Sequence, residues 1–162
     1  MRKLKSHRKV KNFALEKMLP DLEIPEPLLG RLVDHARQEY PLESCGILAG
    51  KMGKIIRFFP MENIEKSSFS YLMGPEEQLR VFREIEDEGL ELSAIYHSHP
   101  HSPAFPSQRD IDHAFYPDTL ILIISLMDQG APEIRAFQIK DGKIEKRSIR
   151  IMGENEPQPT SL

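Results

Sequence analysis

Cysteine is nearly absent from this chain, because Cys45 is the single one among 162 residues. One cysteine cannot form a disulfide within the chain, and it cannot build a thiolate-rich zinc site. Any metal site in this protein must therefore rest on histidine, aspartate and glutamate side chains.

Long hydrophobic runs are missing as well. The longest apolar run, Leu120 to Leu126, is far shorter than the roughly 18 residues that span a bilayer and is typical of a buried strand. The N-terminus is basic, but no apolar block with a small-residue cleavage site follows it, so no secretory signal is predicted. A cytoplasmic location without membrane association is the default expectation.

The net charge of the chain is small, but the charged residues are unevenly distributed. The net charge is −3, yet residues 1–22 hold seven basic and two acidic side chains, so this arm carries +5 and the remainder −8. A basic arm can contact nucleic acid or an acidic partner, although a solvated arm is the more common outcome. The remainder has no basic stripe, so nucleic-acid binding is not expected of it.

The composition favours one globular domain. Hydrophobic residues make up 40% and charged residues 29% of the chain, which is ordinary for a globular protein and argues against disorder. No internal repeat or low-complexity block divides the sequence. We expect a basic N-terminal extension over residues 1–24, one domain over residues 25–152 and a flexible C-terminal tail over residues 153–162.

Apolar periodicity and turn residues predict the elements. A first helix is expected between Pro25 and Tyr40, and a second from Pro75 to Gly89 with Leu79, Phe82 and Ile85 on its apolar face. A short helix is expected from about residue 107. The expected strands cover residues 46–51, 54–59, 69–72, 92–98, 119–126, 133–140 and 143–151. This mixed order predicts an α+β domain with a mainly antiparallel sheet.

The segment from Tyr96 to Asp110 carries the most informative residues. Residues two apart on a strand point to the same face, so His97 and His99 can present both imidazoles to one ion. Asp110 lies in the first turn of the expected short helix and can supply a third, oxygen ligand. Three such ligands leave one tetrahedral position for water, which is typical of a catalytic zinc site.

Each of these residues also has a plainer interpretation. A His-x-His pair on a strand usually binds no metal, and Ser107 followed by Asp110 fits a helix N-cap. Cys45 is expected to be a small buried residue rather than a thiol nucleophile.

The other histidines have similar alternatives. His101 is expected at a surface or at the rim of a substrate site, because Pro100 interrupts the strand. His113 fits an exposed helical residue better than a partner of a metal ligand, and His35 fits a packing role beside the first helix.

Two motifs together resemble a known family. The pattern His97-Ser98-His99, seven residues, Ser107, two residues, Asp110 resembles the JAMM signature of the MPN+ (Mov34/MPN/PAD-1) zinc metalloproteases. Glu43-Ser44-Cys45-Gly46 is similar to the acidic motif of that family and begins 54 residues before His97. The resemblance covers residues 26–151, and in length the chain is most similar to the compact prokaryotic members.

The resemblance implies a fold, a metal and an activity. It implies an MPN fold, with a curled sheet around helices, and a catalytic domain that holds Zn²⁺ through His97, His99 and Asp110. Glu43 would accept a proton from water and deliver it to the leaving amine, and Ser107 would donate a hydrogen bond to the oxyanion.

The implied activity is that of a metallopeptidase. It would hydrolyse a peptide or isopeptide bond after the Gly-Gly tail of a ubiquitin-like or sulfur-carrier protein. The alternatives are a non-catalytic MPN scaffold that binds proteins, a zinc hydrolase of small amides and a relative associated with DNA repair. Nothing in the sequence indicates an oligomeric state.

Overall fold

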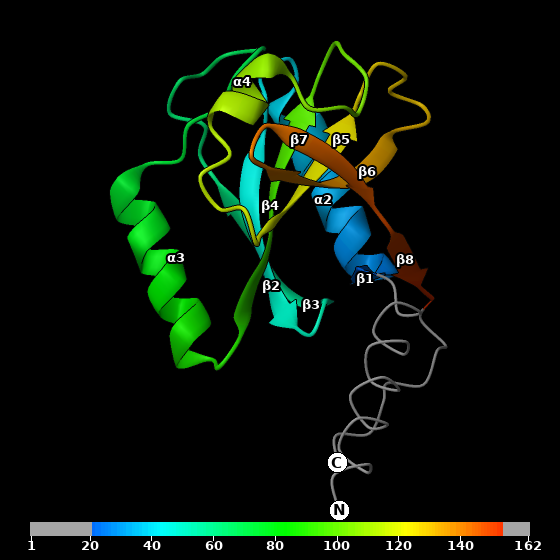
Figure 1. Cartoon of the computed structure of the whole chain (residues 1–162). Helices are drawn as coiled ribbons and strands as arrows, with labels where there is room; N and C mark the ends of the chain where they lie inside the picture. The colour runs from blue at the N-terminus through cyan, green and yellow to red at the C-terminus, as the bar shows by residue number, and fades with distance from the viewer. Residues whose placement is uncertain (1–20, 154–162) are drawn as a thin grey trace, which may run out of the picture.

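An eight-stranded mixed sheet forms the centre of the computed structural model, which describes residues 21–153 (Figure 1). Its order is β7-β6-β5-β4-β2-β3-β1-β8. The strands are β1 (Leu22–Pro25), β2 (Cys45–Lys51), β3 (Lys54–Met61), β4 (Glu91–His99), β5 (Leu120–Ser125), β6 (Glu133–Lys140), β7 (Lys143–Arg147) and β8 (Ile149–Met152). Strand β4 is parallel to β5, and β1 is parallel to β3 and β8, while the other neighbours are antiparallel. The expected α+β class with a mixed sheet is confirmed.

The ends of the expected domain are only partly described. Residues 1–20 of the basic extension and residues 154–162 of the tail lie outside the described residues. Residues 22–24, which the sequence assigns to the extension, form most of β1, where Leu22 and Ile24 are buried. The sheet therefore begins before residue 25, because this short apolar segment finds its partners in β3 and β8.

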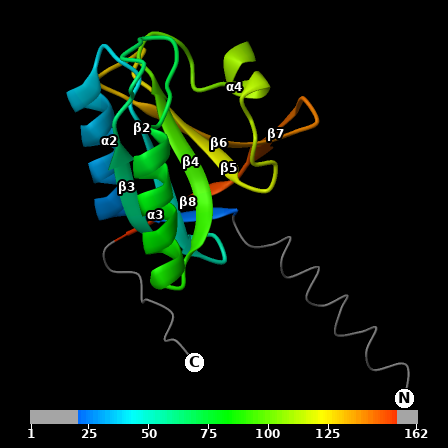
Figure 2. The ribbon, with the colours of Figure 1, turned by 90° about the vertical axis from the view of Figure 1, so that its left-hand side faces the viewer.

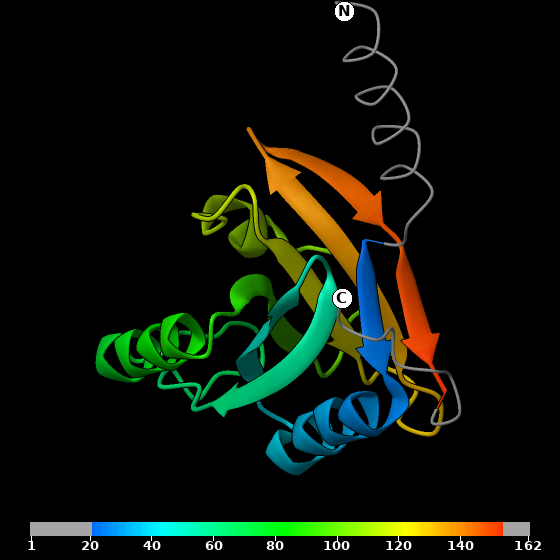
Figure 3. The same ribbon diagram turned by 90° about the horizontal axis from the view of Figure 1, so that it is seen from below.

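The sheet is strongly curled, as Figure 3 shows. Strands β7 and β8 stand at opposite ends of the strand order, yet only Ser148 separates them in the sequence. A sheet whose two edges are joined by one residue must bend round. The expected single strand over residues 143–151 is thus two strands, and Asp21 fixes the break by accepting the Ser148 amide over 2.9 Å.

Two helices cover opposite faces of the sheet (Figure 2). Helix α2 (Glu26–Glu39) packs against the face that carries Leu48 and Tyr96, and α3 (Pro75–Asp87) packs against the face that carries Ile47. The alternation of Ile47 and Leu48 between two cores explains why β2 is a continuous apolar run. Both helices are where the sequence predicts them. No helix among the described residues is long and apolar enough to cross a membrane.

The strand expected at Phe69–Leu72 does not form. That segment belongs to a loop with a single bridge between Asn63 and Met73. The loop backbone bonds to a side chain instead: Asn63 Oδ1 accepts the Leu72 amide over 3.1 Å, and Asn63 Nδ2 donates to the Glu43 carbonyl over 3.1 Å. The prediction was wrong because an asparagine, rather than a neighbouring strand, satisfies these groups.

The apolar face of α3 also differs from the prediction. The helix buries Val81 and Ile85, whereas Leu79 is 51% exposed. Residues two apart on a helix point in nearly opposite directions. The stripe therefore includes Val81 and leaves Leu79 in solvent, so the assignment of Leu79 to the core face was wrong.

Candidate metal centre

His97 and His99 lie at the C-terminal end of β4, in the middle of the sheet. They share the strand face that points away from α2, and they are exposed by only 0% and 3%. Their Nε2 atoms are 3.1 Å apart. The spacing of two along a strand therefore brings both imidazoles to one point, as the sequence predicts.

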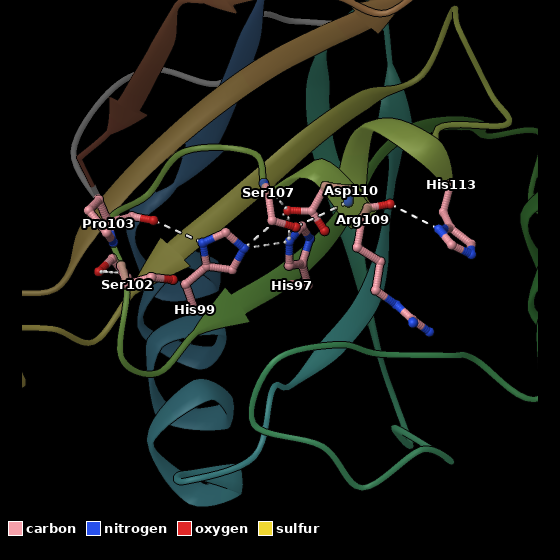
Figure 4. A network of polar contacts seen from close by, with 9 residues as sticks. His97, His99, Ser102, Pro103, Ser107, Arg109, Asp110 and His113 are labelled. Atoms are coloured by element: carbon pink, nitrogen blue, oxygen red, sulfur yellow. Dashed lines mark hydrogen bonds and ion pairs between the residues drawn. The ribbon is translucent and has the colours of Figure 1, made fainter.

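A capped short helix brings Asp110 to the same point (Figure 4). Helix α4 (Gln108–Asp112) begins after Ser107, whose Oγ accepts the Asp110 amide over 3.1 Å. In return, Asp110 Oδ2 accepts the Ser107 amide over 2.9 Å, which completes a capping box. The same Oδ2 lies 3.2 Å from Nε2 of both His97 and His99.

These three atoms fit one tetrahedral zinc ion. The sides of their triangle measure 3.1, 3.2 and 3.2 Å. Zinc bonds of about 2.0–2.1 Å at tetrahedral angles separate neighbouring ligands by about 3.3–3.4 Å. Widening the triangle by a few tenths of an ångström would admit an ion. Within the described residues, this is the one group of His, Cys, Asp and Glu side chains close enough to hold a metal.

A hydrogen bond to the backbone fixes the orientation of the His99 ring. His99 Nδ1 lies 2.9 Å from the Pro103 carbonyl oxygen, which can only accept, so Nδ1 carries the hydrogen. Nε2 is then unprotonated and offers its lone pair. His97 Nδ1 has no hydrogen-bond partner within the described part of the chain, and the ring of Tyr71 stacks on the His97 ring at 4.7 Å.

Electrostatics favour the ligand forms of His97 and Asp110. Burial lowers the pKa of His97, which keeps the imidazole neutral. Burial alone would raise the pKa of Asp110, but hydrogen bonds with His97 and His99 outweigh it and hold that pKa well below its usual range. For His99, burial lowers the pKa, but the Asp110 hydrogen bond outweighs it, so the net shift is upward.

Glu43 is a buried carboxyl group beside this cluster. It is 4% exposed, and its Oε2 has no hydrogen-bond partner among the described residues. Burial raises its pKa to about 8, and the charges of His99 and Asp110 are near enough to shift that pKa further in opposite directions. Its amide donates to the Ser67 carbonyl over 2.9 Å, so the backbone is fixed while the carboxyl oxygen stays free.

The remaining candidate residues are placed as follows. Ser107 is exposed and caps α4, and because its oxygen accepts the Asp110 amide, its hydroxyl hydrogen remains available to donate. Cys45 is fully buried, and burial raises the pKa of its thiol to about 12, which favours the small buried residue over the nucleophile. His101 is exposed at the surface, and its ring contacts Tyr40 at 5.4 Å.

Two further histidines of the described residues lie outside the cluster of His97, His99 and Asp110. His113 is exposed, and its Nδ1 lies 2.9 Å from the Arg109 carbonyl oxygen. His35 is half-buried, with its ring against Phe58 and Tyr96.

A cavity that the sequence did not predict adjoins the ligands. It has a volume of about 120 Å³, and His97 and Asp110 form part of its wall. The loop residue Tyr71, whose ring stacks on His97, also lines it. No sequence signal marks this cavity, because its walls come from a loop, from α4 and from β4 and β5, which are separate in the chain.

Residues 25–140 match the family model for prokaryotic homologs of the JAB domain. The chain belongs to this family. The JAMM/MPN+ resemblance inferred from the two motifs is thereby confirmed.

Two relatives that match most of this chain are named as a peptidase and a protease. The chain is 36% identical to CysO-cysteine peptidase of Mycobacterium tuberculosis over 133 residues, which cover 81% of this chain and 91% of the relative. It is also 36% identical over 123 residues to the probable TtuB-protein conjugate cleaving protease of Thermus thermophilus, covering 75% of this chain and 78% of that protein.

Solved structures share the fold. A protein from Desulfitobacterium hafniense matches with a TM-score of 0.76 at 31% identity, over 82% of this chain and 94% of that chain. A JAB1/MPN domain protein from Archaeoglobus fulgidus matches with a TM-score of 0.55 at 15% identity, over 81% of this chain and 97% of that chain. The expected MPN fold is confirmed.

Proposed function

We propose that this protein is a zinc metallopeptidase that cleaves the peptide or isopeptide bond after the Gly-Gly tail of a ubiquitin-like or sulfur-carrier protein. One observation carries the proposal: Nε2 of His97, Nε2 of His99 and Oδ2 of Asp110 converge within 3.2 Å of one another. Beside them lies the buried carboxyl group of Glu43, whose Oε2 has no hydrogen-bond partner among the described residues. This is the donor set of a zinc site with one open position.

The three ligands would hold the ion through two neutral imidazoles and one carboxylate. Zinc bound there would supply a Lewis acid that lowers the pKa of water and polarises the scissile carbonyl. Asp110 brings a negative charge to the site, and the capping box with Ser107 fixes the direction of its carboxylate. His99 keeps its orientation through the Pro103 carbonyl.

Glu43 would move the protons of the reaction. Beside a bound cation the pKa of Glu43 would fall below its raised metal-free value of about 8. As a carboxylate it would accept a proton from the attacking water while the water oxygen bonds to the carbonyl carbon. The carbon–nitrogen bond then breaks, and Glu43 gives that proton to the nitrogen, which leaves as an amine. The partnerless Oε2 suits this task, because no internal hydrogen bond has to be broken first.

Ser107 would stabilise the tetrahedral oxyanion. Its hydroxyl oxygen is occupied by the Asp110 amide, so its hydrogen is the group left to donate. A donor aimed at developing charge lowers a barrier by about 3 kcal/mol. Capping and oxyanion binding are thus compatible in one side chain, whereas the sequence presented them as alternatives.

The relatives support the substrate class. Their names specify a CysO-cysteine peptidase, a probable TtuB-protein conjugate cleaving protease and desampylases. The match to the first relative spans 91% of that protein and 81% of this chain, so it is a match over most of both proteins. An extended tail that adds to a sheet edge would provide main-chain recognition.

Cleavage can be tested directly with the zinc-loaded protein. It is incubated with ubiquitin-like and sulfur-carrier proteins that carry C-terminal extensions or lysine conjugates, and mass spectrometry identifies the cut bond. We expect cleavage after Gly-Gly that stops on chelation and returns with zinc. Glu43→Gln should bind zinc and turn over at least about 100-fold more slowly.

The alternative is a non-catalytic scaffold. It predicts partner binding without any cleavage and no effect of Glu43→Gln. A protein that binds zinc but cleaves none of these substrates would contradict the peptidase and favour the scaffold or a small-amide hydrolase.

A further inference from the structure

A chain of four hydrogen-bonded side chains lies behind the metal-site histidines, on the α2 face of the sheet. His35 Nδ1 is 3.2 Å from the Tyr96 hydroxyl, and that hydroxyl also contacts the Ser44 hydroxyl. Ser44 Oγ donates to Ser98 Oγ over 2.9 Å. This chain of hydrogen bonds runs through the core, because the exposed fractions of Tyr96, Ser44 and Ser98 are 0%, 1% and 0%.

The members of this chain alternate with the candidate site residues. Ser98 lies between His97 and His99, and Ser44 directly follows Glu43. Successive side chains of a strand point to opposite faces. The ligands therefore face the metal site, while Ser98 faces α2 from the same stretch of backbone.

Ser44 and Ser98 are joined by their backbones as well. The Ser98 amide donates to the Ser44 carbonyl over 3.0 Å, which continues the β2–β4 ladder beyond the pair Cys45–His97. The Ser44 amide donates to Ser98 Oγ over 2.8 Å. With the hydroxyl bond, three hydrogen bonds connect the residue after Glu43 to the residue between the two histidines.

The bonds have one direction. Since the Ser44 hydroxyl gives its hydrogen to Ser98, the Ser44 oxygen accepts from Tyr96, and the Tyr96 oxygen accepts from His35 Nδ1. Tyr96 is thus the link between helix α2 and the two serines. Its ring also packs edge-on against Phe58 with centroids 5.6 Å apart, and this contact restricts the position of the hydroxyl group.

We propose that Tyr96, Ser44 and Ser98 are positioning residues that hold Glu43 in register with His97 and His99. The inference rests on the proposed function, because a proton carrier must stay at a fixed place relative to the metal ligands. A displacement of about 1 Å can reduce a rate about 100-fold. Stability does not require this polar chain, because apolar residues of the same shape would fill the space at little cost.

Amide hydrogen exchange tests this positioning role of Tyr96, Ser44 and Ser98, here called the clamp, without any substrate. Tyr96→Phe keeps the ring and removes only the hydroxyl. We expect the amides of Glu43 and Ser44 to exchange at least about tenfold faster in this variant, while the Leu48 amide in the middle of β2 keeps its rate. Unchanged exchange at Glu43 and Ser44, or the same acceleration at Leu48, would overturn the proposal.

Steady-state kinetics tests the consequence for turnover. Tyr96→Phe and Ser98→Ala should lower kcat about 10- to 100-fold with KM unchanged, and the absorption spectrum of the Co²⁺-loaded protein should stay the same. Ser98→Thr retains the hydroxyl and should restore most of kcat.

A stability control separates positioning from folding. Val81→Ala removes buried volume under α3, outside the hydroxyl chain, and should lower the melting temperature with kcat unchanged. If Tyr96→Phe behaves in the same way, the chain is structural only and the proposal fails.

The two proposals fail in different ways. A wild-type protein that turns over no substrate contradicts the proposed function, and the exchange experiment still decides the clamp. A wild-type protein that turns over normally, with Tyr96→Phe equal to it in kcat, contradicts the clamp alone.

Discussion

One carboxylate oxygen organises the site at the scale of single residues. Asp110 Oδ2 is within 3.2 Å of both imidazole nitrogens and accepts the Ser107 amide over 2.9 Å. The same atom thus caps the start of α4 and faces the proposed metal position. The charge on this oxygen, rather than its shape, is what a divalent ion needs.

Asp110→Asn is therefore expected to weaken zinc binding at least about 100-fold with the fold retained, because the amide oxygen can still cap α4 but carries no charge. Competition with a chromophoric chelator measures the affinity. Asp112→Asn is the matched control, because Asp112 lies on the same helix and bonds to Gln108 instead. Equal loss in both variants would assign the effect to the helix rather than to the ligand.

The pKa of Glu43 predicts a dependence of stability on pH. Burial raises this pKa from 4.5 to about 8, so between these values the folded, metal-free protein holds a proton that the unfolded chain releases. The stability that Glu43 contributes by holding this proton is fully present below pH 4.5 and is lost as the pH rises through about 8.

Urea denaturation of the metal-free protein measures this term. From pH 5 to 8.5, the wild type should lose stability relative to Glu43→Gln, whose side chain does not titrate. A difference between the two proteins that does not change with pH would show that Glu43 is solvated like an ordinary surface carboxyl.

Local signals predicted the elements that they fully determine. Helix α2 begins beside two prolines and ends before Pro41, and β6 is bounded as expected at Glu133 and Lys140 because Asp141-Gly142 sets the hairpin. The strand expected over residues 69–72 was wrong, since that segment belongs to a loop whose order depends on a side chain that reaches another part of the chain. Local patterns contain no information about such a contact.

Asn63 is the residue on which that loop depends. Its amide accepts from the backbone of Glu65 and Leu72 and donates to the carbonyls of Glu43 and Ser70, all at 2.9–3.1 Å. Asn63→Ala leaves buried backbone groups without partners and should cost about 1–3 kcal/mol of unfolding free energy. Chemical denaturation measures it, and wild-type stability in this variant would refute the role.

Gly46 in the acidic motif is required by a close approach of two strands. A Cβ at Gly46 would lie 2.6 Å from the Phe59 carbonyl oxygen, inside the ladder between β2 and β3. Gly46→Ala should therefore destabilise the protein by about 1–3 kcal/mol.

A second glycine gives the control for this variant. At Gly30, in the exposed middle of α2, a Cβ meets nothing within 4 Å, so Gly30→Ala should stabilise by about 0.5–1 kcal/mol. Thermal unfolding of both variants tests the pair. Shifts of the same sign would contradict the assignment of either glycine.

At the scale of the whole molecule, the site exists only in the folded chain. Glu43 precedes β2, the two histidines lie at the end of β4, and Asp110 lies on α4. Segments that are distant in the sequence therefore meet at one end of the central strands. The sequence could pair the histidines by the period of a strand. Asp110 was expected as a third ligand from its place in the first turn of the short helix, but only the family resemblance implied that Glu43 belongs with them, because no local pattern measures that distance.

The curl of the sheet was equally beyond local reasoning. The parallel pairing of β1 with β3 and β8 joins the start of the described chain to its end, and no periodicity indicates which strands will meet. The fold class followed from the order of the elements. The family resemblance implied a curled sheet, but the strands that meet in it and the cavity beside His97 followed only from the structure.

X-ray absorption at the zinc edge tests the central claim most directly. The zinc-loaded protein should show one ion per chain with only nitrogen and oxygen neighbours at about 2.0–2.2 Å, two of them imidazoles. His97→Ala removes one of the two imidazoles, so the imidazole signature of any zinc that is still bound should weaken. A sulfur neighbour at about 2.3 Å, or zinc retained with an unchanged spectrum in His97→Ala, would contradict the site described for this protein.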